Sequence, residues 1–327
     1  MASQIPVSIN FLKRLELYKT EKPFRIHVGQ PAGLPEMRTT NIETEPKIVM
    51  LTDVRGKEGD YNLDTHGFQF VTHHQEFSSF TEAQAVEKEY LPEVETVILD
   101  NVPGADRAVV FDWRIRKQLQ QSYQDRNVLV SPLELQDPTL ALAPSQTVHT
   151  GIKMPLNTYT LRKRVKMHLG EEAKELLEGR VQMIKQLRRP IKHTAYNWPL
   201  VLCDSQTSPL EQLVSVDQVG WRFVGDIYYA PYDPLFRWYF QSAMTTKEGV
   251  IIKSWDTDLS ARSRFCLHSS CSLPDGLVPN GSRPRASIEV RALVFLLDIL
   301  ASTVLKRLVI DVRSLLLQPQ NLEVNQT

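Results

Sequence analysis

Two histidines and an arginine–serine pair are the residues of this sequence whose types could do chemistry together. His149 and His268 lie far apart along the chain, and Arg285 and Ser287 follow the second histidine at the start of a strand-like run. Imidazole is a common ligand of iron and other transition metals. A guanidinium beside a hydroxyl can hold a carboxylate through two hydrogen bonds. This order of residues is therefore what a metal site with an adjacent 2-oxoglutarate site needs.

The charge balance of the chain indicates what kind of molecule it binds. The chain has 327 residues with 38 basic and 38 acidic side chains, so its formal net charge is zero. Because a nucleic-acid partner normally requires a basic surface, the balanced charge argues against one and favours a small-molecule partner. The length suits one large domain with appendages. Cys203, Cys266 and Cys271 lack the even number of a disulfide framework and the paired spacing of a zinc site, so we interpret them as reduced thiols.

No segment of the sequence has the pattern of a signal peptide or a membrane span. The first ten residues lack a basic region followed by an apolar one. Residues 292–305 are apolar, but Asp298 interrupts them and they are shorter than the roughly 20 residues that a spanning helix needs. We therefore expect a soluble, cytoplasmic protein without a membrane span.

Short apolar runs separated by proline, glycine and aspartate dominate the middle of the chain and predict strands. The expected strands are 47–51, 67–71, 96–99, 107–112, 199–203, 221–229, 237–240, 250–255 and 286–295. Helices are expected at 79–90 and at 170–186, where apolar residues recur at helical spacing. Residues 1–50 are rich in proline and threonine, which predicts an extended N-terminal arm.

Many short strands with few helices predict a mainly β fold with some α structure, of the α+β class, arranged as a sandwich or barrel. The sequence lacks the glycine-rich loop of nucleotide-binding proteins and the G-x-S-x-G motif of serine hydrolases. Residues 296–327 repeat apolar side chains at the spacing of an amphipathic helix. We expect this C-terminal extension to close the body of the protein or to join two copies into a homodimer.

Several sequence blocks occur in the order found in a known fungal family. They are Leu63–Phe68, Glu178–Arg180, Arg189–Ile191, Pro199–Leu200, Cys203–Asp204, Arg237–Tyr239, Ile252–Lys253 with Asp256, and Pro284–Phe295. On these blocks the chain resembles the AsaB-type hydroxylase/desaturase family, which is related to gibberellin desaturases and to the CmcJ protein of cephamycin biosynthesis. The resemblance implies a double-stranded β-helix, jelly-roll or cupin-like, over residues 51–295, with flanking helices, as in non-haem iron/2-oxoglutarate oxygenases. It also implies a role in fungal secondary metabolism.

The resemblance gives roles to individual residues. It implies that His149 and His268 are the metal-binding imidazoles, and that Arg285 and Ser287 bind 2-oxoglutarate. These are the residues that the spacing alone singled out. The family would therefore use Fe(II) and 2-oxoglutarate at this site.

The chain departs from the family around the expected iron pocket. Where the family has His-x-Asp-Gln, the sequence has His149–Ile152, in which Gly151 replaces the carboxylate ligand. Trp113 stands where the family has a histidine. A site of two histidines binds a divalent ion more weakly than one with a carboxylate, unless an anion takes the third position. These departures favour an oxygenase scaffold that has lost its metal.

We therefore expect a non-oxidative enzyme that needs no cofactor and holds no metal. A closed apolar cavity suits dehydration, or pericyclic cyclisation of the hetero-Diels–Alder type, of a hydrophobic polyketide-like or terpenoid-like intermediate. The expected catalytic residues are His149, His268, Arg285, Lys185 and Arg188. The expected substrate-binding residues are Trp113, Ser287, Tyr228, Trp238 and Lys253.

Two other functions fit the same residues. One is an Fe(II)/2-oxoglutarate-dependent hydroxylase, desaturase or halogenase in which His149 and His268 alone hold the metal. The other is a carrier that binds a hydrophobic metabolite without changing it. A strict requirement for iron and 2-oxoglutarate would reject the non-oxidative enzyme, and product formation above the spontaneous rate would reject the carrier.

Overall fold

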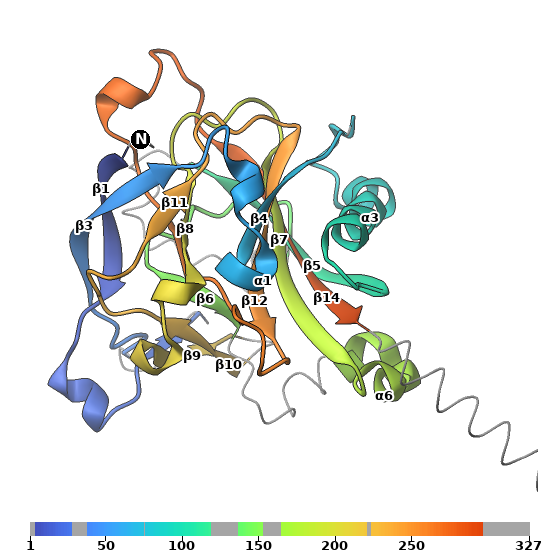
Figure 1. Ribbon diagram of the computed structural model, residues 1–327, viewed down its shortest axis with the longest axis horizontal. Coiled ribbons are helices and arrows are strands. Elements are labelled where there is room, and N and C mark those ends of the chain that lie inside the picture. Colours follow the sequence, from blue (N-terminus) through green and yellow to red (C-terminus); the bar gives the residue numbers. More distant parts are fainter. Residues whose placement is uncertain are drawn as a thin grey trace, which may run out of the picture.

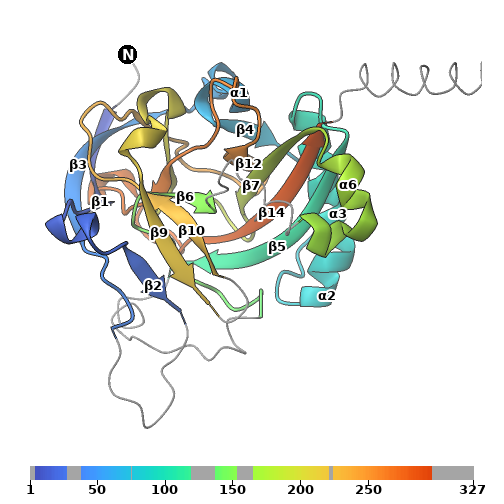
Figure 2. The same cartoon turned by 90° about the horizontal axis from the view of Figure 1, so that it is seen from below.

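The computed structural model describes residues 4–27, 38–74, 76–118, 137–152, 165–220 and 224–296 of the chain. Over these residues the protein consists of two β-sheets with short helices beside them (Figure 1). The larger sheet has nine strands in the order β1-β3-β11-β8-β13-β6-β10-β9-β2. The smaller has five in the order β4-β12-β7-β14-β5, and Figure 2 shows the two sheets on opposite sides of the molecule.

Most neighbouring strands run antiparallel, and only the pairs β2–β9 and β3–β11 among the described strands are parallel. The strands are β1 (Gln4–Leu12), β2 (Phe24–Ile26), β3 (Thr44–Asp53), β4 (Phe68–Thr72), β5 (Arg107–Lys117), β6 (His149–Ile152), β7 (Arg180–Pro190), β8 (Leu200–Cys203), β9 (Val214–Val219), β10 (Val224–Tyr229), β11 (Trp238–Phe240), β12 (Glu248–Asp256), β13 (His268–Ser270) and β14 (Ala286–Leu296). The α-helices are α1 (Leu63–His66), α2 (Ala83–Ala85), α3 (Leu91–Asn101) and α6 (Ala173–Leu176). Single turns of other helix types are η1 (Glu16–Lys19), η2 (Glu58–Asp60), η3 (Val86–Tyr90), η5 (Gly170–Glu172), η6 (Ser205–Thr207), η7 (Leu210–Gln212) and η8 (Asp275–Leu277).

The N-terminal residues belong to the larger sheet. Val7, Ile9 and Phe11 alternate along β1 and are buried in the core, and β1 pairs with β3 along its whole length. This alternation is the pattern of a strand with one buried face. The region expected as an extended arm, residues 1–50, therefore contributes β1, β2 and the start of β3 to the sheet.

The smaller sheet is covered on one face by helix α3. Ile288, Val290, Ala292 and Val294 alternate along β14 and pack in one cluster with Val94 and Val97 of α3. Figures 1 and 2 both show α3 beside β5 on the side of this sheet that faces away from the larger sheet. The intervening residues of β14 therefore face the interior of the protein, toward the larger sheet.

Apolar side chains of the two sheets meet between them. Leu200 and Leu202 of β8 pack with Val250 and Ile252 of β12 in one buried cluster. Because residues paired across strands share a face, the register of β8 with β13 places His268 on the same inner face as Leu202. The polar residues of the candidate site therefore lie in a region enclosed by both sheets.

Two expected elements differ from the structure. Residues 170–186, expected as one long helix, form the short turns η5 and α6 and then enter strand β7. The backbone of β7 pairs with both β12 and β14, so sheet formation prevails over the helical spacing of its apolar residues. Residues 96–99, expected as a strand, lie inside helix α3, where Val94, Val97 and Ile98 form its buried side.

The remaining expected strands are confirmed within one to a few residues. They correspond to parts of β3, β4, β5, β8, β10, β11, β12 and β14. Residues 221–223 of the expected strand 221–229 lie outside the described residues, as do residues 297–327 of the C-terminal extension. The expected helix 79–90 corresponds to α2 and η3.

Two further sequence expectations concern the cysteines and the membrane. Cys203, Cys266 and Cys271 are buried free thiols, and burial raises the pKa of Cys203 and of Cys271 to about 12. Within the described parts of the chain, we find no helix with the length and apolar character to cross a bilayer.

Candidate functional site

The two histidines singled out in the sequence lie side by side. His149 begins β6 and His268 begins β13, and the two residues pair across these neighbouring strands. Their ring centroids are 4.5 Å apart. Both side chains are buried, with exposed fractions of 8% and 0%. Because bonds from a metal to imidazole nitrogen are about 2.0–2.1 Å long, two rings at this separation can bind one ion.

Backbone carbonyls fix the proton on each ring. Nδ1 of His149 lies 2.8 Å from the carbonyl oxygen of Thr147, and Nδ1 of His268 lies 3.1 Å from that of Cys266. A carbonyl can only accept, so Nδ1 donates in both rings and the lone pair of the neutral imidazole is on Nε2. Metal-binding histidines are commonly held in this way. The two imidazoles therefore fit a metal site.

The described residues supply no carboxylate to this site. No group of three or more histidine, cysteine, aspartate or glutamate side chains in the described part of the chain could hold a metal ion. Gly151 lies two residues after His149 on β6, and a Cβ atom built on it would meet Ser254 of β12 in the facing sheet. Among the described residues, the histidine donors brought together here are the imidazoles of His149 and His268.

Tyr229 extends the row of rings to a third strand. It pairs with His149 across β10 and β6, and its ring centroid lies 6.3 Å from that of the histidine. Burial raises the pKa of Tyr229, so its hydroxyl stays protonated at neutral pH. The sequence prediction named Tyr228 instead, which is only partly buried and packs against the main hydrophobic core.

The expected carboxylate-binding pair is also assembled. Arg285 is 5% exposed, and its Nε and Nη2 donate to Oγ of Ser287 at 3.2 and 3.1 Å. Its Nη1 donates to the carbonyl of Trp198 and to Oγ of Ser270, the latter at 3.5 Å. Ser270 lies two residues after His268 on β13. One hydrogen bond therefore connects the strand of the second histidine to the arginine.

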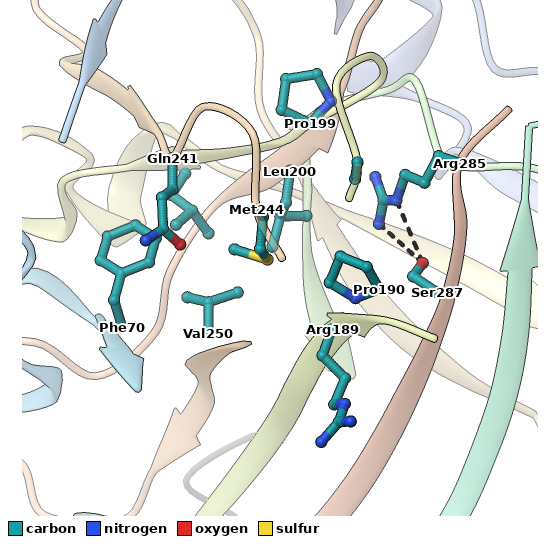
Figure 3. A pocket seen from close by; sticks show the side chains of 12 residues that line it. Phe70, Arg189, Pro190, Pro199, Leu200, Gln241, Met244, Val250, Arg285 and Ser287 are labelled. Carbon is teal, nitrogen blue, oxygen red and sulfur yellow. Dashed lines mark hydrogen bonds between the residues drawn. The ribbon is translucent and has the colours of Figure 1, made fainter. Parts of the chain in front are cut away.

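Arg285 and Ser287 line a pocket between the two sheets. The rest of its lining is mostly apolar and consists of Phe70, Arg189, Pro190, Ala195, Pro199, Leu200, Leu202, Gln241, Met244 and Val250. Figure 3 shows Arg285 and Ser287 pointing toward each other at one side of this pocket, while the guanidinium of Arg189 points away from them. The histidines do not line the pocket, but Leu202 does, and it pairs with His268.

Two expected substrate-binding aromatic residues lie in hydrophobic cores. Trp113 of β5 packs in the cluster between the smaller sheet and α3, which is on the face away from the histidines. Trp238 of β11 packs against Phe11 and Phe236 in the main core, and it borders a second pocket on the surface near β1 and β3. Large apolar rings gain most from complete burial, which explains both positions.

Lys253, expected to bind substrate, lies in a network of charged side chains. Its side chain is fully buried, and its Nζ lies 2.9 Å from Oδ1 of Asp64, 2.8 Å from Oδ2 of Asp256 and 3.1 Å from the carbonyl of Ser263. These contacts use all three donors of an ammonium group. The ammonium group of Lys253 therefore neutralises the buried Asp256 and the more exposed Asp64, and its expected contact with substrate stays a prediction. Arg180 contacts the same Asp256 at 2.6 Å.

Lys185 and Arg188, expected as catalytic, belong to β7, but their side chains lie outside the described residues. Three residues beside the site were not identified from the sequence. Ser270 contacts Arg285, Tyr229 lies beside His149, and Ser254 of β12 lies against Gly151. The spacing His268-x-Ser270 was an available signal, because alternate residues of a strand share a face.

Curated relatives of the chain are fungal enzymes. Hydroxylase/desaturase efuI of Hormonema carpetanum is 28% identical over 279 residues, which cover 80% of this chain and 90% of efuI. The Fe(II)/2-oxoglutarate-dependent dioxygenase nvfI of Aspergillus novofumigatus is 27% identical over 270 residues, covering 80% of this chain and 87% of nvfI.

A solved structure shares the fold. A variant of the iron and alpha-ketoglutarate-dependent endoperoxidase NvfI superposes with a TM-score of 0.73 at 22% identity, covering 90% of this chain and 99% of the other. This likeness confirms the predicted double-stranded β-helix with flanking helices.

The comparisons contradict the expectation that no cofactor is needed. The relative nvfI and the solved NvfI structure are both named as dependent on Fe(II) and 2-oxoglutarate. The interpretation as a non-oxidative dehydratase or cyclase gains no support from them, and the oxygenase alternative does. The expectation depended on the one carboxylate that Gly151 replaces, whereas the imidazole pair and the arginine–serine pair are both retained.

A family model described as "Oxidoreductase/YMDC permease-like domain" matches residues 9–295. This range includes all the strands that carry the histidines and the arginine–serine pair. The match and the relatives along 80% of the chain agree in the class of enzyme. The chain therefore belongs to this oxidoreductase family, together with fungal hydroxylases and desaturases.

Proposed function

We propose that the chain is an oxidoreductase of fungal secondary metabolism that uses Fe(II) and 2-oxoglutarate to hydroxylate or desaturate a hydrophobic metabolite. The observation that carries this proposal is the connected arrangement of the two imidazoles, 4.5 Å apart, with the buried Arg285 and Ser287. The names of the relatives support the choice of cofactors.

The residues present fit both groups. His149 and His268 would hold the metal through Nε2, because their Nδ1 atoms are used by backbone carbonyls. Arg285 and Ser287 would hold a carboxylate of 2-oxoglutarate, since the guanidinium presents several donors in one plane and a hydroxyl lies within 3.2 Å of it. When bound, the two groups together supply the means to oxidise a carbon–hydrogen bond with molecular oxygen.

The protein around the site contributes orientation and exclusion of water. The hydrogen bond from Arg285 to Ser270 ties the arginine to the strand of His268, which keeps the two halves of the site in register. The apolar lining from Leu200, Leu202, Met244 and Val250 surrounds the arginine with a medium of low polarity. In such a medium a charge-assisted hydrogen bond to a carboxylate is stronger than in water.

The direct test is formation of succinate from 2-oxoglutarate by the purified protein under air with added Fe(II). We expect turnover above the rate with EDTA, and a loss of about 100-fold or more in His149→Ala and His268→Ala, since even residues that only support metal ligands contribute 10–100-fold. His27→Ala, an exposed histidine, is the matched control and should retain full turnover. Equal turnover in the wild type and both site variants would reject the proposal.

A second measurement examines the cosubstrate site. Arg285→Lys keeps the positive charge but loses the planar guanidinium, whose paired N–H groups can hold both oxygens of a carboxylate. We therefore expect the KM for 2-oxoglutarate to rise about tenfold or more while kcat changes less. Arg283→Lys, exposed and two residues upstream, is the control. Metabolite binding without any succinate formation would instead favour a carrier.

A further inference from the structure

Gly151 and Ser254 exclude a side chain from the position next to the histidines. A Cβ atom built on Gly151 would lie 2.4 Å from Oγ and 2.6 Å from Cβ of Ser254, far closer than atoms in contact can approach. Gly151 lies on the same strand as His149, two residues after it, whereas Ser254 comes from β12 of the facing sheet. Ser254 therefore occupies the volume in which any side chain of residue 151 would begin.

The hydroxyl of Ser254 is buried without a hydrogen-bond partner. The residue is 1% exposed, and no polar atom of the described residues pairs with its Oγ. A buried hydroxyl left in this state costs about 1–3 kcal/mol. The neighbouring Lys253, in contrast, has partners for its whole ammonium group. Such a donor, held next to the strand of a metal-binding histidine, is suited to a small ligand bound beside it.

We propose that Ser254 serves the third position of the metal site by donating a hydrogen bond to a small exogenous anion. The inference rests on the proposed function, because it needs a divalent ion held by His149 and His268. Two neutral imidazoles leave the charge of such an ion uncompensated, and Gly151 offers no carboxylate. An anion bound to the metal ion would offset this positive charge. The hydroxyl of Ser254 would hold the anion in position and gain a hydrogen-bond acceptor for its own proton.

Ser254 is on this account a positioning residue that selects an exogenous ligand over a protein carboxylate. Gly151 and Ser254 should then be interdependent. An aspartate at 151 has no room while Ser254 is present, and it gains room only when the serine is shortened. Neither consequence is expected if Ser254 merely fills space in the core.

The test uses Co(II) as the probe metal and azide as the probe anion on the full chain. Calorimetry gives the affinity for Co(II), and visible absorption of the bound Co(II) reports its coordination. For the wild type we expect azide to alter the spectrum and to tighten Co(II) binding about tenfold. In Ser254→Ala, Co(II) should still bind, but the affinity for azide should fall about tenfold, the value of one hydrogen bond to a charged group. Ser208→Ala, another fully buried serine, should behave as the wild type.

The paired variants test the steric part. Gly151→Asp alone should lower the thermal midpoint and fail to improve Co(II) binding. Gly151→Asp with Ser254→Gly should fold, bind Co(II) more tightly than the wild type, and lose the response to azide. An unchanged azide response in Ser254→Ala, or a wild-type Co(II) spectrum indifferent to azide, would overturn the inference and leave the proposed function standing. Failure of the wild type to bind Co(II) at all would overturn both.

Discussion

Gly67 and Gly56 have nearly the same left-handed backbone conformation but different surroundings. Gly67 ends helix α1 with φ of 82°, and its amide donates to the carbonyl of Leu63. A Cβ atom there would lie 2.7 Å from the carbonyl oxygen of Phe265. Gly56 has φ of 81° and nothing within 4 Å of such a Cβ. The first position is therefore restricted by both conformation and space, and the second by conformation alone.

We expect Gly56→Ala to lower the free energy of unfolding by about 1 kcal/mol, the usual cost of a left-handed backbone for alanine. Gly67→Ala should lower it by about 2–4 kcal/mol, because backbone atoms must also move. Urea denaturation followed by circular dichroism measures both. Equal shifts of the two midpoints would show that the contact with Phe265 relaxes freely.

Lys253 offers a second prediction for single residues. Lys253→Met removes the ammonium but leaves the buried Asp256 with fewer partners, and breaking a buried pair from one side costs about 3–5 kcal/mol. Lys13→Met is the matched control, since its pair with Glu43 is about half exposed, and it should change the free energy of unfolding far less. Chemical denaturation at pH 7 gives both values, and similar losses would contradict the buried role of Lys253.

The ion pair of Lys253 with Asp64 gives a pH dependence. Burial alone would raise the pKa of Asp64, but the hydrogen bond from Lys253 and the charges of Lys253 and Arg180 outweigh it and lower the pKa below the ordinary 3.8. Stability from a depressed carboxyl is complete above its unfolded pKa and is lost as the pH falls through the folded value. The difference in stability between the wild type and Lys253→Met should therefore narrow below about pH 4. A difference that stays constant from pH 7 to pH 3 would contradict this.

At the site, residue types and spacing predicted His149, His268, Arg285 and Ser287 because all four lie in motifs of the chain. Ser254 and Tyr229 could not be predicted in the same way. Their nearness to the histidines depends on which strands face or neighbour β6, and this register is not written in a short stretch of sequence. The ion pairs of Lys253 could not be predicted either, because Asp64 is distant in the sequence and reaches Lys253 only by folding.

Among the elements, β14 is an interior strand of the smaller sheet, where it pairs with β5 on one side and with β7 on the other. Ile288 on this strand is fully buried against the cluster that includes α3, whereas Ile48 on β3 is 64% exposed. Ile288→Ala should lower the free energy of unfolding by about 2–5 kcal/mol. Ile48→Ala removes the same atoms and should change it by less than about 0.5 kcal/mol. Comparable losses in the two variants would contradict the assigned burial.

Strand positions were predictable for short runs that are rich in apolar and β-branched residues, as in β12 and β14. Residues 180–186 were not, because their apolar side chains fit a helical spacing as well as a strand. Pairing with β12 and β14 decides between the two, and it comes from distant parts of the chain. For the same reason residues 96–99 read as a strand but lie in α3.

For the whole molecule, the amphipathic pattern of residues 297–327 still predicts a contact between two copies of the chain. We expect sedimentation of the full chain to give the mass of a dimer, and of a chain ending at Leu296 to give that of a monomer. Because the site residues all precede Leu296, the shorter chain should keep its affinity for Co(II). A monomeric full chain would reject the expected homodimer.

The burial of Cys203, Cys266 and Cys271 has a consequence for durability. Reactive oxygen species attack the thiolate, and thiols whose pKa is raised to about 12, as for Cys203 and Cys271, contain almost none of it at neutral pH. An enzyme with the proposed function would work with dioxygen, and the burial of these three cysteine side chains would protect their thiols from oxidation. Alkylating reagents should then modify these side chains only as the chain unfolds. The rate of labelling therefore measures the rate at which the protein unfolds.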